Sequence, residues 1–218
     1  MAITAHNASQ FMRRICTAAP IMPVLVIKDA NTATDLGLAL LRGGLPILEV
    51  TLRTPAALDA IKVMSDLPGV TVGAGTVLNA KDAEAAKDAG AQFAVAPGAT
   101  DNLIEACTAL DLPLLPGAVT ASEAMQLLDH GFDFMKFFPA ETSGGAAALK
   151  ALAGPLPQIA FCPTGGITAQ NATQYLALPN VICAGGSWIA PASLVEQKNW
   201  GAIQQLAADA AQMPSSKI

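Results

Sequence analysis

The feature of this chain that most restricts its fold is a regular alternation of short apolar runs with alanine-rich segments of helical periodicity. Eight runs rich in valine, isoleucine and leucine have the length of buried strands. They begin near Pro23, Pro46, Val70, Gln92, Pro113, Asp133, Gln158 and Val181. Because the runs recur about every 20 to 25 residues, they predict parallel strands joined by crossover helices, since hairpins cannot join parallel neighbours.

Eight consecutive strand–helix units favour an α/β fold of one architecture, a closed (β/α)8 TIM barrel. On this interpretation residues 1–218 form a single domain. Residues 1–20 supply an N-terminal helix that caps the barrel, 23–190 the eight units, and 191–218 a C-terminal helix and tail. An open doubly wound sheet is the main competitor. Its glycine-rich dinucleotide turn would follow an early strand, where this chain has only Ile27-Lys28-Asp29.

Capping residues mark where two of the intervening helices begin. Asn79 precedes a helical segment that closes at Gly90. Thr120 and Glu123 have the spacing of a capping box, in which each side chain bonds to the backbone of the other residue. The helix signals therefore fall between the predicted strands.

The charge of the chain restricts its partners. Acidic side chains outnumber basic ones by 17 to 12, and the net charge of -5 argues against nucleic acid as the main partner. Charges, proline and glycine break every apolar run well short of the ~18 residues that a membrane-spanning helix needs. The opening residues lack the apolar core of a secretion signal, so we expect a soluble protein of the cytoplasm.

The cysteines and histidines do not suggest a metal site or a disulfide framework. There is no C-x-x-C pair and no histidine beside any of the four cysteines, Cys16, Cys107, Cys162 and Cys183. Buried, reduced thiols are expected. With only two histidines in the chain, the chemistry must come from other residue types, and no metal is expected.

Two charged residues lie within or just after the second predicted strand, in the segment PILEVTLRT. By the period of two along a strand, Glu49, Thr51 and Arg53 share one face, while the other face is apolar. The active site of such a barrel lies at the C-terminal ends of the strands. A carboxylate and a guanidinium directed there need a partner or a ligand. An internal Glu49–Arg53 ion pair is the structural alternative to a catalytic role, and the two can coexist.

Lys136 is the most informative residue of the chain. It lies in DFMKFFPAE, a strand that is otherwise apolar and aromatic after its first residue. Aromatic surroundings and a nearby cation are expected to lower the pKa of a lysine towards neutrality, and a neutral amine can attack a ketone to form a Schiff base. The alternative is a stem that packs on the aromatic rings while the ammonium reaches solvent.

Glycine-rich turns follow the seventh and eighth predicted strands, as PTGGIT and GGSW. Barrel enzymes often bind phosphate there, because glycine lets backbone N–H groups approach an anion and a following helix N-terminus adds a favourable dipole. The candidate phosphate-binding residues are Gly165, Gly166, Gly185, Gly186 and Ser187. A phosphorylated ligand is therefore expected, although ordinary turns also use glycine.

These segments together resemble the 2-keto-3-deoxy-6-phosphogluconate (KDPG) aldolases, class I lyases of the Entner–Doudoroff pathway. The resemblance extends from PVLVI near residue 23 through LEVTLRT, VGAGTVL, APGAT, LPG, KFFPAE and FCPTGGI to GGSW near residue 185. It implies a (β/α)8 barrel, a homotrimer, and no cofactor or metal beyond a covalent Schiff base. The implied reaction cleaves a phosphorylated 2-keto-3-deoxy sugar acid to pyruvate and D-glyceraldehyde 3-phosphate.

The resemblance also implies roles for individual residues. Lys136 corresponds to the Schiff-base lysine and Glu49 to the general acid and base. Arg53 and Thr76 resemble the residues that hold the pyruvate carboxylate. The residues that would shape the pocket are Pro97, Phe138 and Thr164. An aliphatic residue is typical of the related 6-phosphogalactonate aldolases at the position of Thr164, which favours the gluconate series.

Other functions remain open at this stage. Within the family, the main substrate could instead be 2-keto-3-deoxy-6-phosphogalactonate or 4-hydroxy-2-oxoglutarate (KHG). Outside it, a phosphosugar isomerase or epimerase would use Glu49 as a base and Lys136 only for its charge. A phosphosugar-binding protein without activity is the third reading, although a binder would not need a buried amine.

Overall fold

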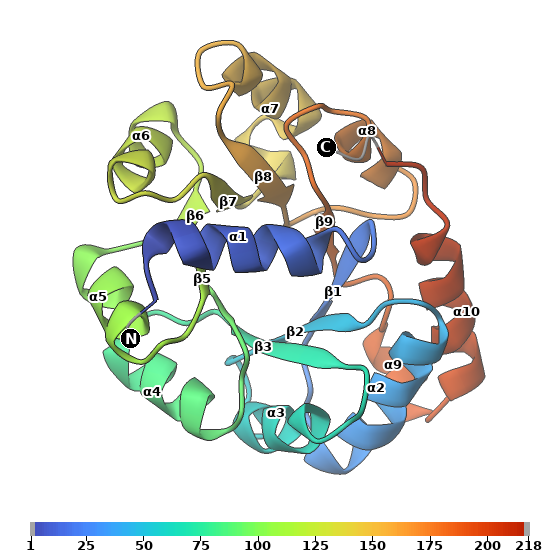
Figure 1. Ribbon diagram of the computed structural model, residues 1–218. Coiled ribbons are helices and arrows are strands. Elements are labelled where there is room, and N and C mark those ends of the chain that lie inside the picture. The colour runs from blue at the N-terminus through green and yellow to red at the C-terminus, as the bar shows by residue number, and fades with distance from the viewer. Residues whose placement is uncertain (1–2, 216–218) are drawn as a thin grey trace.

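The computed structural model describes residues 3–215 as a curled parallel β-sheet surrounded by helices (Figure 1). The strands are β1 (Ile21–Leu25), β2 (Ile47–Thr51), β3 (Thr71–Gly75), β4 (Ala94–Val95), β5 (Leu114–Leu115), β6 (Gly117–Ala118), β7 (Phe134–Phe137), β8 (Ala160–Pro163) and β9 (Ala184–Gly186). Each of the eight predicted apolar runs contains at least one of them. The alternation of strand and helix is therefore confirmed.

The fifth run is divided into two strands. Pro116 separates β5 from β6, because proline has no N–H to donate to a neighbouring strand. Six strands pair in the order β5-β4-β3-β2-β1-β9 and three in the order β6-β7-β8, and all the pairs are parallel. The interruption at Pro116 thus falls where one hydrogen-bonded sheet ends and the other begins.

The helices lie mainly on the outer side of the sheet (Figure 1). They are α1 (Ala5–Cys16), α2 (Ala33–Arg42), α3 (Ala57–Ser65), α4 (Ala80–Asp88), α5 (Asp101–Ala109), α6 (Ala121–Asp129), α7 (Gly145–Ala153), α8 (Ala172–Leu176), α9 (Ala192–Glu196) and α10 (Trp200–Ala211), with short 3-10 helices η1 (Ala30–Thr32) and η2 (Glu141–Ser143). No helix within residues 3–215 is long and apolar enough to cross a membrane.

The predicted caps are confirmed. Asn79 caps α4 by accepting a hydrogen bond from the backbone N–H of Asp82 at 3.0 Å. Thr120 and Glu123 form the reciprocal capping box at the start of α6. At the C-terminal end the chain forms two helices instead of one, because Lys198 takes a left-handed conformation and Asn199 caps a new helix. Residues 216–218 of the predicted tail lie outside the described part.

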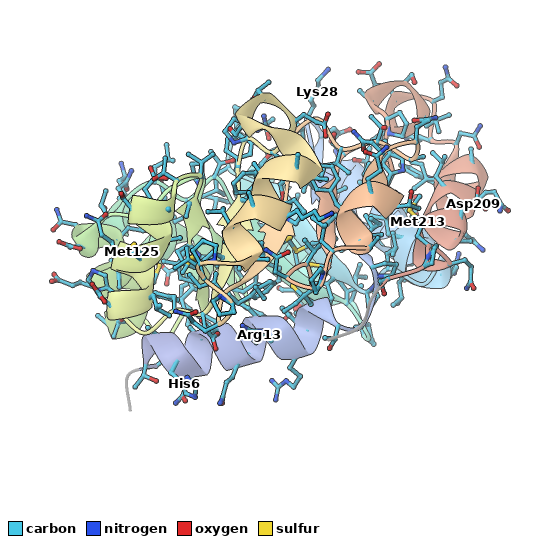
Figure 2. All side chains as sticks on the ribbon, turned by 90° about the horizontal axis from the view of Figure 1, so that it is seen from above. His6, Arg13, Lys28, Met125, Asp209 and Met213 are labelled. Carbon is cyan, nitrogen blue, oxygen red and sulfur yellow. The ribbon has the colours of Figure 1, made fainter. Side chains whose placement is uncertain are left out.

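The first helix, α1, crosses one end of the curled sheet (Figure 1). In Figure 2 it occupies one side of the molecule, whereas Lys28, which follows β1, lies on the opposite side. Met12 and Cys16 of α1 are buried in a cluster with Phe93, which precedes β4, Leu115 of β5 and Phe134 of β7. The helix therefore covers the end where the strands begin, and the end where they finish stays accessible.

Truncation of Met12 tests this packing. The side chain is fully buried, so Met12→Ala leaves a cavity that α1 cannot fill, and we expect a loss of about 2–5 kcal/mol in the free energy of unfolding. Urea denaturation measures it. The matched control is Asn7→Ala on the exposed side of the same helix, which should stay within about 0.5 kcal/mol. Equal stabilities of the two variants would contradict the sealing role of α1.

Candidate active site

A cavity of about 390 Å³ lies at the C-terminal ends of the strands. Its lining includes eleven of the twelve residues that the sequence singles out: Glu49, Arg53, Thr76, Pro97, Lys136, Phe138, Thr164, Gly165, Gly166, Gly185 and Ser187. These residues come from strands and turns distributed over most of the chain. Parallel strands bring them together because their C-terminal ends all face the same side.

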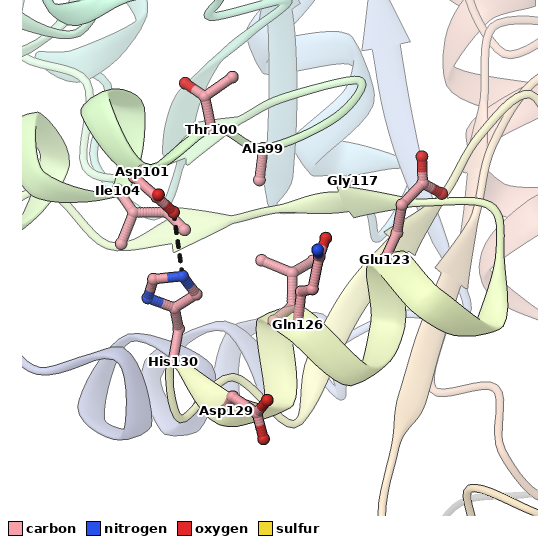
Figure 3. Close-up of a pocket in the computed structure, with 10 residues that line it drawn as sticks. Ala99, Thr100, Asp101, Ile104, Gly117, Glu123, Gln126, Asp129 and His130 are labelled. Carbon is pink, nitrogen blue, oxygen red and sulfur yellow. Dashed lines mark ion pairs between the residues drawn. The ribbon is translucent and has the colours of Figure 1, made fainter.

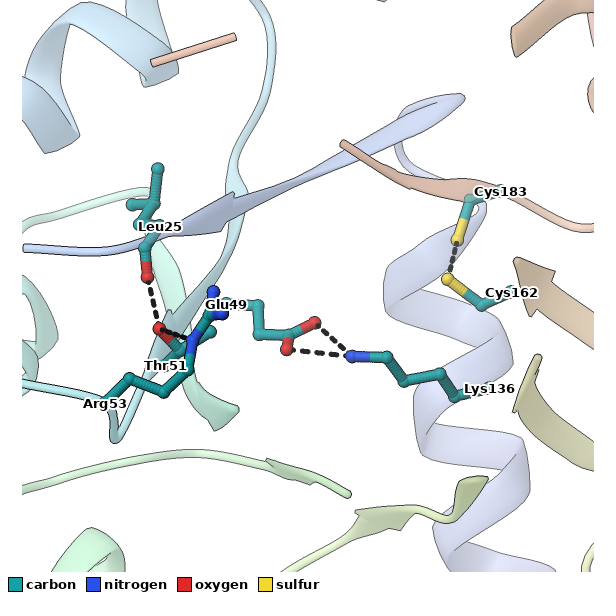
Figure 4. Close-up of polar contacts among 7 residues, drawn as sticks. All are labelled: Leu25, Glu49, Thr51, Arg53, Lys136, Cys162 and Cys183. Atoms are coloured by element: carbon teal, nitrogen blue, oxygen red, sulfur yellow. Dashed lines mark hydrogen bonds and ion pairs between the residues drawn. The ribbon is translucent and has the colours of Figure 1, made fainter. Parts of the chain in front are cut away.

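Lys136 and Glu49 form a buried ion pair at the base of this cavity. The Lys136 Nζ atom lies 3.0 Å from Glu49 Oε1 and 3.4 Å from Oε2 (Figure 4). Glu49 is 0% exposed and Lys136 5% exposed. A charge removed from water to this degree is stable only with a partner, so each side chain fixes the position of the other.

The surroundings of Lys136 differ from the prediction in one respect. The expected neighbour was a cation, and the expected ion pair, if any, joined Glu49 to Arg53. Within residues 3–215 the ion-pair partner of Glu49 is Lys136 instead. The reason is geometric, because Lys136 in β7 lies across the interior from β2, whereas Arg53 lies beyond the end of β2. The aromatic neighbour is present, since the Phe138 ring centroid lies 5.4 Å from Lys136 Nζ.

Gly75 provides the space for the Glu49 carboxylate. The two strands β2 and β3 pair in register, with Glu49 opposite Gly73 and Thr51 opposite Gly75. A Cβ atom at Gly75 would lie 2.2 Å from Glu49 Oε1. The second glycine of GAGT, Gly75, is therefore required by the Glu49 carboxylate and not by a turn.

Thr51 holds the guanidinium of Arg53. Arg53 Nε donates to Thr51 Oγ1 at 3.3 Å, and the Thr51 hydroxyl donates to the backbone oxygen of Leu25 at 2.9 Å (Figure 4). A guanidinium has five N–H donors, and this bond occupies one of them. Arg53 can therefore be held in place and still bind a carboxylate.

Thr51 is also a cavity residue that was given no role from the sequence. The signal was present, because Thr51 shares the strand face of Glu49. Val24 and Ile167 are further lining residues of this kind, but an apolar side chain carries no chemical signal in a sequence.

Three lining residues shape the side of the cavity. Thr76 follows β3 with φ at +61°, a left-handed conformation that is unfavourable for threonine and is found where the surrounding structure enforces it. Pro97 follows β4 after one intervening residue, and Phe138 follows β7 directly. All three leave their strands at the accessible end, which is where a substrate would enter.

The glycine turn after β8 forms another side of the cavity. Gly165 and Gly166 have φ values of +100° and +78°, which side chains rarely allow. Thr164 Oγ1 is buried and has no hydrogen-bond partner within the described part of the chain. A Cβ atom at Gly185 would lie 2.3 Å from that hydroxyl oxygen. A buried hydroxyl without a partner in the protein is suited to bind a ligand.

The position of Gly186 differs from that of the other predicted phosphate-binding residues. Gly186 does not line the cavity, and a Cβ atom there would lie 2.0 Å from the Trp188 ring. Successive residues of a strand face opposite sides, so Gly185 faces the cavity and Gly186 faces the indole. The expected helix dipoles are also weak contributors, since α8 and α9 have five residues each and begin several residues after the turns.

Comparison with known proteins agrees with this geometry. A model of the KDPG and KHG aldolase family matches residues 12–206. The 2-dehydro-3-deoxy-phosphogluconate aldolase of Pseudoalteromonas atlantica is 52% identical over 192 residues, 88% of this chain and 89% of the relative. The chain belongs to the KDPG and KHG aldolase family. This family consists of lyases that act through a Schiff base without a metal.

Two solved KDPG aldolase structures resemble the fold over more than nine-tenths of this chain. The enzyme of Zymomonas mobilis, solved with 3-phosphoglycerate, has a TM-score of 0.92 and 46% identity over 96% of this chain and 99% of its own. The enzyme of Legionella pneumophila, solved with pyruvate captured as a covalent carbinolamine, has a TM-score of 0.89 and 43% identity over 92% of this chain and 98% of its own.

Two thiols lie near Lys136 in this aldolase-family site, and Cys162 is opposite Lys136 in the pairing of β7 with β8. Cys162 Sγ and Cys183 Sγ are 3.5 Å apart and fully buried (Figure 4). The hydrogen bond with Cys183 and burial raise the pKa of Cys162 well above its usual value. Such thiols are inert packing groups. The residues that the structure describes contain no group of three or more His, Cys, Asp or Glu side chains placed to hold a metal ion.

A larger cavity of about 490 Å³ lies between α5 and α6 (Figure 3). His130 Nε2 and Asp101 Oδ1 approach to 3.1 Å across it. Its lining includes none of the residues predicted for the aldolase site, and no lysine or arginine. The larger cavity is therefore not the one that collects the residues singled out from the sequence.

Replacement of Gly75 tests how tightly Glu49 is held. In Gly75→Ala the new methyl group occupies the position of the carboxylate, so the Glu49–Lys136 distance must increase. We expect a loss of about 1–3 kcal/mol in the free energy of unfolding, as for other overpacked sites. The control is Gly98→Ala, where a Cβ atom meets nothing within 4 Å. Urea denaturation measures the free energy of unfolding of both variants. A Gly75→Ala variant as stable as the wild type would contradict the close contact between Gly75 and Glu49.

Proposed function

We propose that this chain is a class I aldolase that cleaves 2-keto-3-deoxy-6-phosphogluconate to pyruvate and D-glyceraldehyde 3-phosphate. One observation carries the proposal. Lys136 Nζ lies 3.0 Å from Glu49 Oε1 within a buried site that opens into a cavity. An amine and a carboxylate in contact there are the nucleophile and the proton carrier that imine chemistry needs.

Glu49 prepares the amine and assists in forming the imine. Its carboxylate accepts a proton from the Lys136 ammonium, and the free amine adds to the C2 ketone of the substrate. The protonated Glu49 then donates to the carbinolamine hydroxyl, which leaves as water. The product is a protonated imine between Lys136 and C2, and Glu49 is a carboxylate again.

The same carboxylate serves the cleavage step. Glu49 removes the proton of the C4 hydroxyl as the C3–C4 bond breaks, and the released carbonyl group becomes that of D-glyceraldehyde 3-phosphate. The bonding electron pair forms an enamine at C3, for which the protonated imine is the electron sink. Glu49 returns the proton to C3, and hydrolysis of the imine releases pyruvate.

The two ends of the substrate have different binding groups. Arg53, held by Thr51, binds the pyruvate carboxylate together with Thr76, because a guanidinium fork matches a carboxylate. Ser187 and the backbone of three glycines bind the phosphate, and these glycines are Gly165, Gly166 and Gly185. Thr164 offers its unpaired hydroxyl to the substrate. Pro97 and Phe138 enclose the imine.

Replacing Lys136 tests the covalent step. With pyruvate and borohydride, the wild-type protein should acquire a reduced pyruvyl group on Lys136, identified by mass spectrometry of peptides. Lys136→Ala and Lys136→Arg should lose both the adduct and nearly all cleavage, because neither can form an imine. Lys150→Ala removes an exposed lysine of α7 and should behave as wild type. Substantial turnover by Lys136→Ala would reject the proposal.

Replacing Glu49 tests its role as the general acid and base. Glu49→Gln should slow both imine formation and cleavage by about 10²–10⁴, the usual contribution of a general acid and base. An isomerase or epimerase would lose activity in Glu49→Gln but would give no borohydride adduct in the wild type. A protein that only binds phosphosugars would bind ligand without turnover. The adduct thus distinguishes the aldolase from both alternatives.

The substrate preference is decided by direct comparison. We propose the gluconate series because Thr164 lines the cavity with its hydroxyl group free for hydrogen bonding. The order of preference is measured as the rate of pyruvate release from 2-keto-3-deoxy-6-phosphogluconate, from 2-keto-3-deoxy-6-phosphogalactonate and from KHG. A higher kcat/KM for the epimer or for KHG would assign the chain to one of those substrates instead.

We also propose that residues 1–218 form one closed (β/α)8 barrel. Support comes from bridges between Phe161 and Val181 and between Thr164 and Gly185, which join the β8 side to the β9 side. At the other junction only Pro116 intervenes between β5 and β6. We further propose a cytoplasmic enzyme that needs no cofactor or metal, with imine chemistry supplied by Lys136. Its four cysteines are all free thiols, which suits a reducing compartment.

A homotrimer is the proposed assembly. Val26, Leu58 and Leu78 are large apolar residues that are exposed to 46%, 36% and 55%. Val26 directly follows β1, Leu58 lies in the first turn of α3, and Leu78 lies in the segment between β3 and α4. Burying such residues against a second copy would be favourable. Sedimentation should give three times the 22.2 kDa mass of the chain, and Leu78→Asp should reduce it. A monomeric wild type would contradict the assembly.

A further inference from the structure

Glu141 and Tyr175 form a contact that the steps above do not use. Glu141 lies in η2, five residues after Lys136, and Tyr175 lies in α8. The Tyr175 hydroxyl donates to Glu141 Oε1. Neither residue lines the active-site cavity. A role for this pair must therefore act through the elements that it connects.

Those elements are the segment after the lysine strand and the glycine turn. The backbone N–H of Ala140 donates to the Thr164 oxygen at 2.8 Å, and that of Glu141 donates to the Gly165 oxygen at 3.1 Å. In the other direction, the N–H of Thr164 donates to Phe137 at 2.9 Å. The turn that would receive the phosphate is thus hydrogen-bonded to the segment that begins at Lys136.

Glu141 also packs on the turn itself. A Cβ atom at Gly166 would lie 2.6 Å from both Cβ and Cγ of Glu141, so the stem of this residue lies directly against Gly166. From the other side, Asn171 Nδ2 donates to the Gly166 oxygen at 3.1 Å. Gly166 is therefore held by Glu141 of η2 and by Asn171, the residue before α8.

The tyrosine holds Glu141 in that position. Tyr175 is fully buried, whereas Glu141 belongs to the exposed surface, so the hydroxyl is an anchor inside the protein for a side chain that would otherwise be free. A Cβ atom at Gly145 would lie 3.4 Å from the Tyr175 hydroxyl oxygen, so α7 begins against the pair. Burial raises the pKa of the Tyr175 phenol, and the Glu141 carboxylate raises it further.

We propose that Glu141 and Tyr175 are positioning residues that fix the Gly165–Gly166 turn relative to Lys136 and so determine the affinity for the phosphorylated end of the substrate. The inference rests on the aldolase function proposed above. It predicts that the pair affects binding of phosphate but not the chemistry at the amine.

Three variants separate this role from a general effect on folding. Tyr175→Phe removes only the hydroxyl, Glu141→Ala removes the acceptor, and Glu141→Gln keeps an oxygen that can accept from the tyrosine. We expect Tyr175→Phe and Glu141→Ala to raise KM for the phosphorylated substrate about tenfold, the equivalent of one lost hydrogen bond. Their kcat should stay within about twofold, and Glu141→Gln should restore KM. Gln174→Ala, at the exposed neighbour of Tyr175, is the matched control.

Two further measurements test the same variants. The pyruvate concentration that half-saturates borohydride trapping at Lys136 should not change, because pyruvate has no phosphate. The inhibition constant of inorganic phosphate should rise with KM. Tyr175 is the only tyrosine of the chain, so alkaline titration of tyrosinate absorbance follows this phenol alone. Its pKa should fall in Glu141→Ala if the contact exists in solution.

The outcomes are distinguishable. An unchanged KM in both Tyr175→Phe and Glu141→Ala would overturn the inference, as would an equal loss of phosphate affinity and pyruvate trapping, which indicates a merely structural role. If Tyr175→Phe does not fold, Glu141→Ala at the exposed position decides. If the wild type traps no pyruvate, the proposed aldolase function is rejected. The affinities of the wild type and the variants for inorganic phosphate then test the positioning role separately.

Discussion

The buried ion pair between Glu49 and Lys136 is the constraint on which the rest of this structure depends. Two charges without access to bulk water are tolerated only when each neutralises the other. That requirement joins β2 to β7 across the interior of the sheet, through two residues that are 87 positions apart in sequence. It also requires Gly75 on the neighbouring strand, since any side chain there would occupy the position of the carboxylate. The apolar cluster below, sealed by α1, excludes water from the same region.

Glycine has two different functions around this site. At Gly75 and Gly185 it removes a side chain so that a functional group, the Glu49 carboxylate or the Thr164 hydroxyl, can lie against a strand. At Gly165 and Gly166 it permits positive φ values in a turn. The first function concerns space and the second concerns backbone conformation.

Much of the candidate site could be predicted because charged residues are rare within apolar strands such as these. A lysine in an aromatic strand and a carboxylate in an aliphatic one are costly to bury, so they point to chemistry even without a structure. Thr51 and Glu141 are not unusual in this way, because threonine is ordinary in strands and glutamate is ordinary on surfaces. Only the spacing of Thr51 from Glu49 along one strand pointed to the site. Their importance lies in what they contact. The expected Glu49–Arg53 ion pair was wrong, because the partner of Glu49 comes from another strand, β7.

The order of strands and helices, the caps of α4 and α6, and the shared face of β2 could all be predicted from the residues, because they follow from periodicity and local hydrogen bonding along one segment. Three contacts could be found only in the tertiary structure. Lys136 pairs with Glu49, and Tyr175 donates to Glu141. Thr51 accepts from Arg53 while its own hydroxyl donates to the last residue of β1. The physical reason is that contacts between segments depend on the register and curvature of the whole sheet. Those properties are set jointly by packing over many strands, and no single stretch of residues encodes them.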